Sequence, residues 1–226
     1  EAPLAAYRTI DDLEVAGKRA LVRVDFNVPA KDGVVTEATR IERALPTIQE
    51  LSKKGAKVIL LSHFGRPGGK REEKDSLKPV AKKLEQLLGG GVLFAEDCIG
   101  DEAKKAARKM VGGDVAVFEN TRFHKGEEAN DPEFVRALAE NGDVYINDAF
   151  SAAHRAHAST EGLAHLLPSA AGRAMEKELD YLSAALANPE RPMMAIVGGA
   201  KVSTKIEMLL NLVGKEVEHQ IIETLN

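Results

Sequence analysis

The chain has 226 residues, 44% of them hydrophobic, which suffices for one sizeable core or for one domain and part of another. Its formal net charge of -4 argues against a nucleic-acid-binding surface, because proteins that bind the phosphate backbone usually carry a basic excess. The single Cys98 excludes an internal disulfide framework, and no apolar run approaches the ~20 residues of a membrane span, so we expect a cytoplasmic protein that binds neither membrane nor nucleic acid.

Five short apolar runs are typical of buried strands, and segments with a helical spacing of apolar residues separate them. This alternation predicts an α/β fold with a doubly wound, Rossmann-like parallel sheet, right-handed crossovers and helices on both faces. In chain order the predicted elements are a strand at 20–24, a helix at 39–54, a strand at 58–61, a helix at 76–88, a strand at 92–94, a helix at 101–110, a strand at 115–118, a helix at 132–140 and a strand at 144–146.

Two of the predicted helices carry capping signals at their starts. Ser76 is a candidate N-cap for the helix at 76–88, because its hydroxyl can accept a backbone N–H of the first turn. Asp131 is the candidate N-cap of the helix at 132–140, and Pro132 then occupies the first helical position, where its missing N–H costs nothing.

The character of the chain changes after Pro168. Residues 173–188 have a helical apolar stripe, and Pro189 and Pro192 end the predicted helix. A strand at 193–197 and a helix at 206–213 are predicted to follow. We therefore expect a first domain at 1–172, an interdomain helix at 173–190 and part of a second α/β domain at 191–226.

Four of the predicted strands run into short polar signatures, and cationic side chains follow each of them. The carboxyl ends of parallel strands lie along one edge of a sheet, where open α/β folds bind ligands, so we expect Arg66, Arg122 and Arg155 to gather there. An arginine cluster in an acidic chain indicates a site for a small anion. The signatures are Asp25-Phe26-Asn27-Val28-Pro29, Ser62-His63-Phe64-Gly65-Arg66-Pro67, Glu119-Asn120-Thr121-Arg122, and Asn147-Asp148 followed by His154-Arg155-Ala156-His157.

Each signature by itself has a simpler interpretation. Asp25 and Asn27 favour turns for backbone reasons, and Arg66 can be a solvated loop residue. His154 and His157 lie three residues apart, and on a helix such imidazoles can share a metal ion. No third ligand of the usual kind stands at metal-site spacing, so we expect no metal and favour hydrogen bonds from this segment to an anion.

Three further residues with ligand chemistry have no such company in the sequence. Cys98 is isolated, and neither His124 nor His165 belongs to a signature. We expect the two histidines to be surface residues or satisfied core residues.

A glycine-rich turn lies between the predicted strand at 193–197 and the helix that follows it. Gly198-Gly199-Ala200-Lys201 does not match the Gly-x-x-x-x-Gly-Lys-Ser/Thr phosphate loop. Glycines at a helix N-terminus nevertheless expose backbone N–H groups to a phosphate, and Lys201 and Lys205 are one turn apart. The simpler interpretation is a glycine-rich turn with two solvated lysines.

In this order, the signatures resemble the phosphoglycerate kinase family over about residues 9–212. The resemblance implies reversible phosphoryl transfer in glycolysis, between 1,3-bisphosphoglycerate with ADP and 3-phosphoglycerate with ATP. It also implies a monomer in which an N-terminal domain holds the glycerate ligand, a C-terminal domain holds ATP or ADP with Mg²⁺, and a hinge closes the two. The segments that carry it are 24–29, 39–41, 62–67, 119–123, 147–150, 153–159 and 198–202.

The resemblance also implies roles for individual residues. It places Arg40 and Lys201 nearest the phosphoryl group in transit and gives Gly198, Gly199, Lys201 and Lys205 to the nucleotide. One departure is Ser151-Ala152, where many members of the family carry Gly-Thr, and we expect no functional loss from it. The implied glycerate contacts are Asp25, Asn27, Arg40, His63, Arg66, Arg122 and Arg155.

The chemistry of such a reaction supports these roles. The acceptor is a carboxylate, which is already ionised at neutral pH, so no general base has to remove a proton. The reaction needs charge neutralisation and alignment, because loose phosphoryl-transfer transition states depend mostly on positioning and electrostatic stabilisation. Guanidinium groups provide both through bidentate contacts.

The family's chains are far longer than this one. Its magnesium-holding acidic residue, second glycine-rich loop and adenosine contacts have no counterpart here, and the tail after Leu212 is atypical. We therefore expect a truncated chain and keep two hypotheses: a phosphoglycerate kinase, or an isolated 3-phosphoglycerate-binding domain with negligible turnover.

Overall fold

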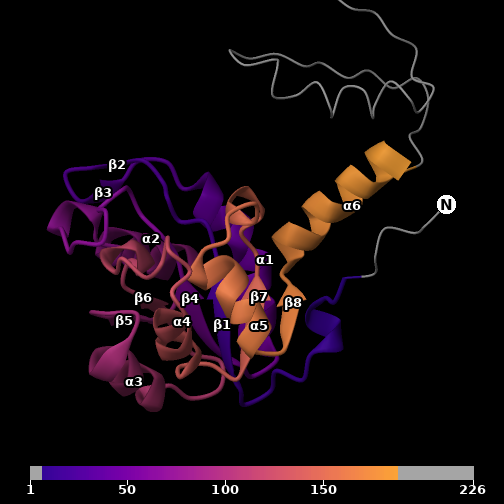
Figure 1. Cartoon of the computed structure of the whole chain (residues 1–226), viewed down its shortest axis with the longest axis horizontal. Coiled ribbons are helices and arrows are strands. Elements are labelled where there is room, and N and C mark those ends of the chain that lie inside the picture. Colours follow the sequence, from indigo (N-terminus) through magenta and orange to yellow (C-terminus); the bar gives the residue numbers. More distant parts are fainter. Residues whose placement is uncertain (1–6, 188–226) are drawn as a thin grey trace, which may run out of the picture. The chain divides into compact units, whose positions relative to one another are not determined.

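A six-stranded parallel sheet runs through the computed structural model, which describes residues 7–187 (Figure 1). The strand order is β5-β6-β4-β1-β7-β8, so the chain starts near the middle and winds to both edges. The doubly wound parallel sheet predicted from the sequence is therefore confirmed. The strands are β1 (Arg19–Arg23), β4 (Lys57–Leu61), β5 (Val92–Ala95), β6 (Val115–Phe118), β7 (Val144–Asn147) and β8 (Ser169–Ala171).

Helices cover both faces of this sheet, and each face has its own hydrophobic core. One core packs α1 and α2 on the sheet, and the other packs α3, α4 and α5, of which α4 and α5 lie in front of the strands in Figure 1. The helices are α1 (Thr39–Lys53), α2 (Lys78–Leu88), α3 (Gly100–Lys109), α4 (Pro132–Ala139), α5 (Leu163–Leu166) and α6 (Arg173–Ala187).

The side chains of β1 show how one strand serves both cores. Val22 belongs to the core under α1 and α2, whereas its neighbour Leu21 belongs to the opposite core. Successive side chains of a strand point to opposite faces, so a strand buried on both faces is a continuous apolar run. This is why the runs predicted the strands so well.

A small hairpin after β1 was not predicted from the sequence. The strands β2 (Ala30–Lys31) and β3 (Val34–Val35) pair antiparallel, and their turn is made by Asp32 at φ 51° and Gly33 at φ 72°. Positive φ at both central residues is the requirement of a tight hairpin turn, which Asp-Gly meets.

The capping predictions had different outcomes. Asp131 Oδ1 accepts the N–H groups of Glu133 and Phe134 over 3.0 and 2.9 Å, which confirms the predicted cap of α4. The prediction for Ser76 was wrong, because α2 begins at Lys78 with Leu77 in the N-cap position. The Ser76 hydroxyl does accept the Lys78 N–H over 3.2 Å, and it also donates to buried Glu119 Oε2 over 2.6 Å.

The first turn of α6 is tied to residues from distant parts of the chain. Arg173 forms ion pairs of 2.8 Å with Asp11 and with Glu50. Asp148 Oδ1 accepts the N–H groups of Ala174 and Met175 over 2.8 and 3.2 Å. These bonds fix where α6 leaves the sheet.

Contacts along the chain group the residues through Glu178 into one unit and those from Leu179 onward into another. The domain limits expected at residues 172 and 190 remain predictions, since residues 188–226 lie outside the described range. The strand at 193–197 and the helix at 206–213 lie outside it too. Within residues 7–187, no helix combines the length and the apolar composition that a membrane crossing requires.

Candidate anion-binding site

The polar signatures predicted from the sequence lie together at the carboxyl edge of the sheet. β6, β4, β1 and β7 are consecutive neighbours, and the last residue of β1, Arg23, pairs with Leu61 of β4 and with Asn147 of β7. The loops that leave these strands therefore start side by side. They carry Asp25 and Asn27 after β1, His63 and Arg66 after β4, Arg122 after β6 and Arg155 after β7, while Arg40 comes from α1.

Hydrogen bonds join three of these loops around Gly65. The Gly65 N–H donates to Asn27 Oδ1 over 2.9 Å, and Arg122 Nη1 donates to the Gly65 carbonyl over 3.1 Å. Gly65 has φ 62°, and a Cβ at this position would meet Asp75 Oδ1 at 2.3 Å. Both facts favour glycine beside the arginines.

Asp25 and Arg40 form the second connection within the site. Arg40 Nη1 lies 2.9 Å from Asp25 Oδ2 and 3.1 Å from the Asn27 carbonyl, and Ser151 Oγ also donates to Asp25 Oδ2. Burial opposes ionisation of Asp25, but hydrogen bonds from Ser151 and the Asn27 N–H, together with the charge of Arg40, hold its pKa below the usual value. Asp25 is thus an ionised residue that orients Arg40, whose side chain stays 48% exposed.

His63 is buried at this edge and is held neutral. Burial lowers its pKa to about 3, and the charges of Arg23 and Arg122 act in the same direction. His63 can therefore offer a neutral N–H donor.

Arg23 was missed by the sequence analysis, although it is only 1% exposed. Its Nη2 contacts His63 Nδ1 over 2.9 Å, its Nε donates to Ser159 Oγ over 2.8 Å, and its Nη1 donates to the Val24 carbonyl. Ser159 Oγ in turn donates to Oε1 of the fully buried Glu127 over 2.5 Å. The signal for Arg23 was a cation inside an otherwise apolar strand run.

Arg122 combines burial with an incomplete set of partners. It is 6% exposed, and its Nε has no hydrogen-bond partner among the described residues. Glu128 Oε1 lies 3.4 Å from that Nε, which makes an ion pair without hydrogen-bond geometry. A buried donor of this kind is satisfied by a bound anion.

Arg66 and Arg155 are the cations of this edge whose side chains are least constrained by other residues. Arg66 is exposed and Arg155 is partly buried, and neither side chain forms a hydrogen bond or ion pair with any residue in the range 7–187.

His154 and His157 lie in a turn and a loop, not on a helix, so the helical spacing that suggested a shared metal does not apply. Gly198, Gly199, Lys201 and Lys205 lie outside the described residues.

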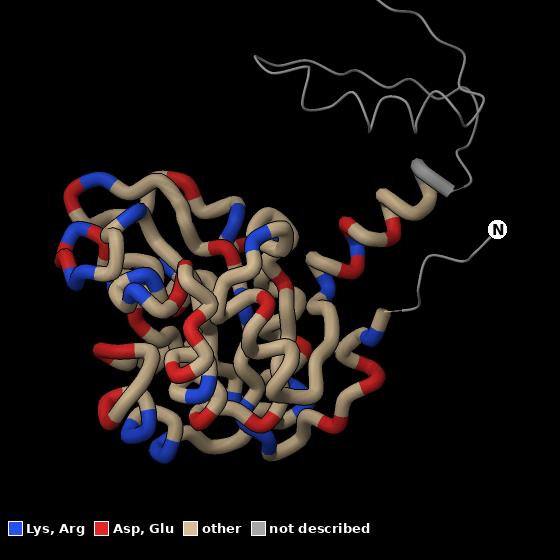
Figure 2. Tube along the Cα trace, viewed as in Figure 1, with Lys and Arg blue, Asp and Glu red and all other residues tan. Residues whose placement is uncertain are grey.

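The carboxyl edge thus has an excess of positive charge that is local. Lys and Arg are interspersed with Asp and Glu along the described trace in Figure 2, whereas this edge gathers guanidiniums from several loops, of which Arg40 and Arg122 form ion pairs, with Asp25 and Glu128. The fold and the edge define a doubly wound α/β protein with a candidate site for a small, multiply charged anion.

Comparisons with known proteins identify the family. The chain belongs to the phosphoglycerate kinase family, whose sequence model, "Phosphoglycerate kinase", matches residues 10–223. It is 65% identical over 213 residues to the phosphoglycerate kinase of Chelativorans sp., covering 94% of this chain and 54% of that protein. For the Brucella melitensis enzyme the identity is 66% over 209 residues, covering 92% of this chain and 53% of that protein.

Solved structures of the family have the same fold. Phosphoglycerate kinase from Coxiella burnetii aligns with a TM-score of 0.83 and 41% identity, covering 93% of this chain and 53% of that one. The structure from Pyrococcus horikoshii aligns with a TM-score of 0.81 and 32% identity, covering 92% and 53%. The chain therefore spans about half the length of the relatives it matches.

Proposed function

We propose that the carboxyl edge of the sheet binds 3-phosphoglycerate, and 1,3-bisphosphoglycerate in the opposite direction, as the glycerate half of a cytoplasmic, monomeric phosphoglycerate kinase. The proposed reaction is phosphoryl transfer between the 1-carboxylate of the glycerate and ADP or ATP, a step of glycolysis. Membership of the family supports the reaction class.

The observation that carries the proposal is that three arginines have hydrogen-bond donors without a partner. Arg122 has a buried Nε without a hydrogen-bond partner, and Arg66 and Arg155 form no ion pair with the described residues. A ligand with a phosphate near -2 and a carboxylate near -1 brings roughly three negative charges, which these guanidiniums match. If Arg66 and Arg155 were ordinary surface arginines with neutralised charge, they would have carboxylate partners, and the ion pair of Arg122 with Glu128 still leaves its Nε without a hydrogen bond.

The other residues have different parts in the proposed site. Asp25 and Asn27 orient Arg40 and accept a hydrogen bond from the ligand hydroxyl, and neutral His63 donates a hydrogen bond. Arg40 remains half-exposed, so its free donors can reach the phosphoryl group in transit, and we give it the catalytic role together with Lys201.

The nucleotide part of the proposal rests on residues outside the described range. We assign ATP and ADP to Gly198, Gly199, Lys201 and Lys205, with closure about a hinge near α6. Mg²⁺ would accompany the nucleotide phosphates. The cluster of metal-ligating groups found among the described residues contains a thiol and an imidazole, which do not suit Mg²⁺.

A second candidate function follows from the share of its relatives that the chain covers. By themselves, the 226 residues bind 3-phosphoglycerate weakly and turn over little or no ATP, because positioning of both substrates is needed for transfer. Calorimetric titrations with 3-phosphoglycerate and, separately, with Mg-ADP test both candidates. Binding of the glycerate alone supports the binding domain, binding of both with turnover supports the kinase, and no glycerate binding contradicts both.

A further inference from the structure

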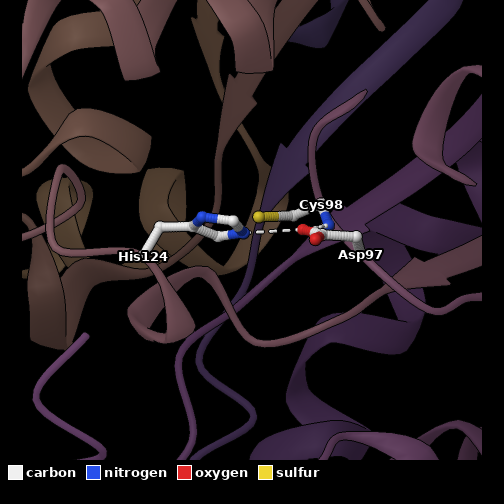
Figure 3. A group of neighbouring side chains, drawn as sticks. All are labelled: Asp97, Cys98 and His124. Carbon is white, nitrogen blue, oxygen red and sulfur yellow. Dashed lines mark hydrogen bonds and ion pairs between the residues drawn. The ribbon is translucent and has the colours of Figure 1, made fainter. Parts of the chain in front are cut away.

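Three side chains that the proposed reaction does not use converge beside the edge strand β5. Asp97 and Cys98 follow β5, His124 follows the short helix after β6, and β5 pairs with β6. One ligand atom of each residue lies within 4.8 Å of those of the other two, and Figure 3 shows the carboxylate and the sulfur beside the imidazole. No motif in the sequence joins them. His124 is partly exposed and hydrogen-bonded, in line with the expectation of a surface or satisfied residue, but Cys98, which is isolated in the sequence, has two neighbours with ligand chemistry in space.

The surrounding chain holds two of these side chains in place. Asp97 Oδ1 accepts the N–H groups of Cys98 and Ile99 over 2.7 and 3.3 Å, and it lies 2.7 Å from His124 Nε2. The His124 ring packs on Phe134 with 5.2 Å between centroids. Metal sites use such outer contacts to orient their ligands before the ion arrives.

We propose that Asp97, Cys98 and His124 form a binding site for a thiophilic divalent cation, with Zn²⁺ as the natural candidate. A carboxylate oxygen, a thiolate sulfur and an imidazole nitrogen are each ordinary zinc ligands, and three protein ligands leave a fourth position for water. This donor set selects against Mg²⁺ and Ca²⁺, which prefer oxygen ligands alone. The proposal is independent of the glycerate site.

Exposure and burial within the cluster suit an ion that enters from solvent. The side chains of His124 and Asp97 are 29% and 35% exposed, whereas Cys98 is fully buried beneath them. The ion would thus sit between an accessible pair and a buried sulfur. Within the described residues Asp97 Oδ2 accepts no hydrogen bond, so one carboxylate oxygen is available while the backbone N–H bonds to Oδ1 remain, and only the bond from His124 Nε2 is given up to the ion.

The charges around Cys98 favour a cation. Burial raises the pKa of its thiol well above the usual value, and the carboxylates of Asp97, Glu127 and Glu119 act in the same direction. The thiol is therefore protonated before the ion binds. Binding forms O–Zn, S–Zn and N–Zn bonds, breaks the hydrogen bond from His124 Nε2 to Asp97 Oδ1, and releases the thiol proton to water, while the ligating imidazole carries its proton on Nδ1.

Two cations near the cluster are neutralised by Glu96, the residue before Asp97. Arg71 and Lys78 both form ion pairs with Glu96, at 3.1 and 3.0 Å. The alternative to a metal site is that the contact between His124 and Asp97 only braces the loop. A spectroscopic probe that reports on sulfur ligation separates the two possibilities.

Titration of the untagged 226-residue chain with Co²⁺ provides that probe, because a cobalt–thiolate bond gives a near-ultraviolet charge-transfer band. We expect one equivalent to bind with this band, Zn²⁺ to displace the Co²⁺, and excess Mg²⁺ to leave it in place. C98S should lose the band, and H124Q should weaken binding at least ~10-fold. The exposed His165, which pairs with Glu161, provides the matched control H165Q, which should behave as the wild type.

Zn²⁺ should also raise the melting temperature of the wild type and of H165Q but not that of H124Q. This second readout uses a partly exposed residue, so it does not depend on the folding of a variant at buried Cys98. The proposal is overturned if Co²⁺ gives no charge-transfer band, if C98S keeps the band, or if H124Q binds as tightly as H165Q.

Discussion

Arg23 and His63 are in contact through Nη2 and Nδ1, which lie 2.9 Å apart in the buried part of the carboxyl edge. A guanidinium can only donate hydrogen bonds, so His63 Nδ1 must be the acceptor. The imidazole is then neutral and carries its proton on Nε2. At its position in the site, His63 therefore contributes a hydrogen-bond donor and no positive charge.

The neutral His63 predicts how stability depends on pH. Its pKa is about 3 in the folded protein, below the usual 6.5, so the unfolded chain binds a proton first as the pH falls. The free energy of unfolding should fall below pH 6.5 by up to about 1.4 kcal/mol per pH unit from this residue. Urea unfolding of wild type and H63Q between pH 7 and pH 5 should give a smaller loss in H63Q, whereas parallel curves would show that His63 titrates normally.

For Asp148 we expect the opposite dependence of the free energy of unfolding on pH. Burial raises its pKa to about 6, above the usual 3.8, so the folded state binds a proton before the unfolded state does. The contribution of Asp148 to stability should be fully present below about pH 3.8 and lost as the pH rises through about 6, by at most about 3 kcal/mol. D148N keeps an acceptor oxygen for the first turn of α6 and should lack this dependence.

The matched control for that variant is D148A, which also removes the buried charge but leaves the N–H groups of Ala174 and Met175 without their acceptor. Loss of such a cap costs about 1 kcal/mol, so at pH 8 D148A should be less stable than D148N. Equal stability of the two variants would exclude a capping role. A wild-type pH dependence that survives in D148N would exclude Asp148 as its source.

Arg66 provides a test of bidentate contact in the glycerate site. R66K keeps the charge but loses the planar fork, and it should weaken 3-phosphoglycerate binding about 10-fold, the equivalent of about 1.4 kcal/mol. R136K is the control, because Arg136 is an exposed arginine on α4. Calorimetry that finds R66K and R136K equally tight would remove Arg66 from the site.

Ser159 is predicted to matter for stability because it joins two buried charges. S159A leaves Arg23 Nε and Glu127 Oε1 without the hydroxyl that now accepts from one and donates to the other. We expect a loss of about 2 kcal/mol in the free energy of unfolding. S169A removes a hydroxyl that donates only to the Leu167 and Ala164 carbonyls, and it should cost less; an equal loss in both variants would argue against the linkage.

The sequence predicted the sheet well because burial on both faces makes its strands continuous apolar runs. It also predicted which loops meet, since the carboxyl ends of neighbouring parallel strands share an edge. It missed β8, whose three residues, Ser169–Ala171, offer no β-branched or aromatic side chain. It placed the start of α2 at Ser76, two residues early, because nothing local shows that this hydroxyl, which does accept the Lys78 N–H, also binds the distant carboxylate of Glu119.

The parts of the site that escaped prediction depend on long-range partners. Arg23 is tolerated in the core because Ser159 and Glu127, far along the chain, satisfy its charge. Asp97 and Cys98 meet His124 only because β5 and β6 pair. A cation in an apolar run marks Arg23 in the sequence, but no local signal names its partners, and none joins Asp97 and Cys98 to His124.

The most direct test of the central claim is a 3-phosphoglycerate titration of ¹⁵N-labelled protein, followed by the backbone amide signals. Asn27, Gly65 and Arg122 belong to the loops that are hydrogen-bonded around the proposed ligand, whereas Arg136 is exposed on α4. We predict saturable shifts of the first three signals and none for Arg136. Saturable binding with unchanged signals for Asn27, Gly65 and Arg122, or no binding, would contradict it.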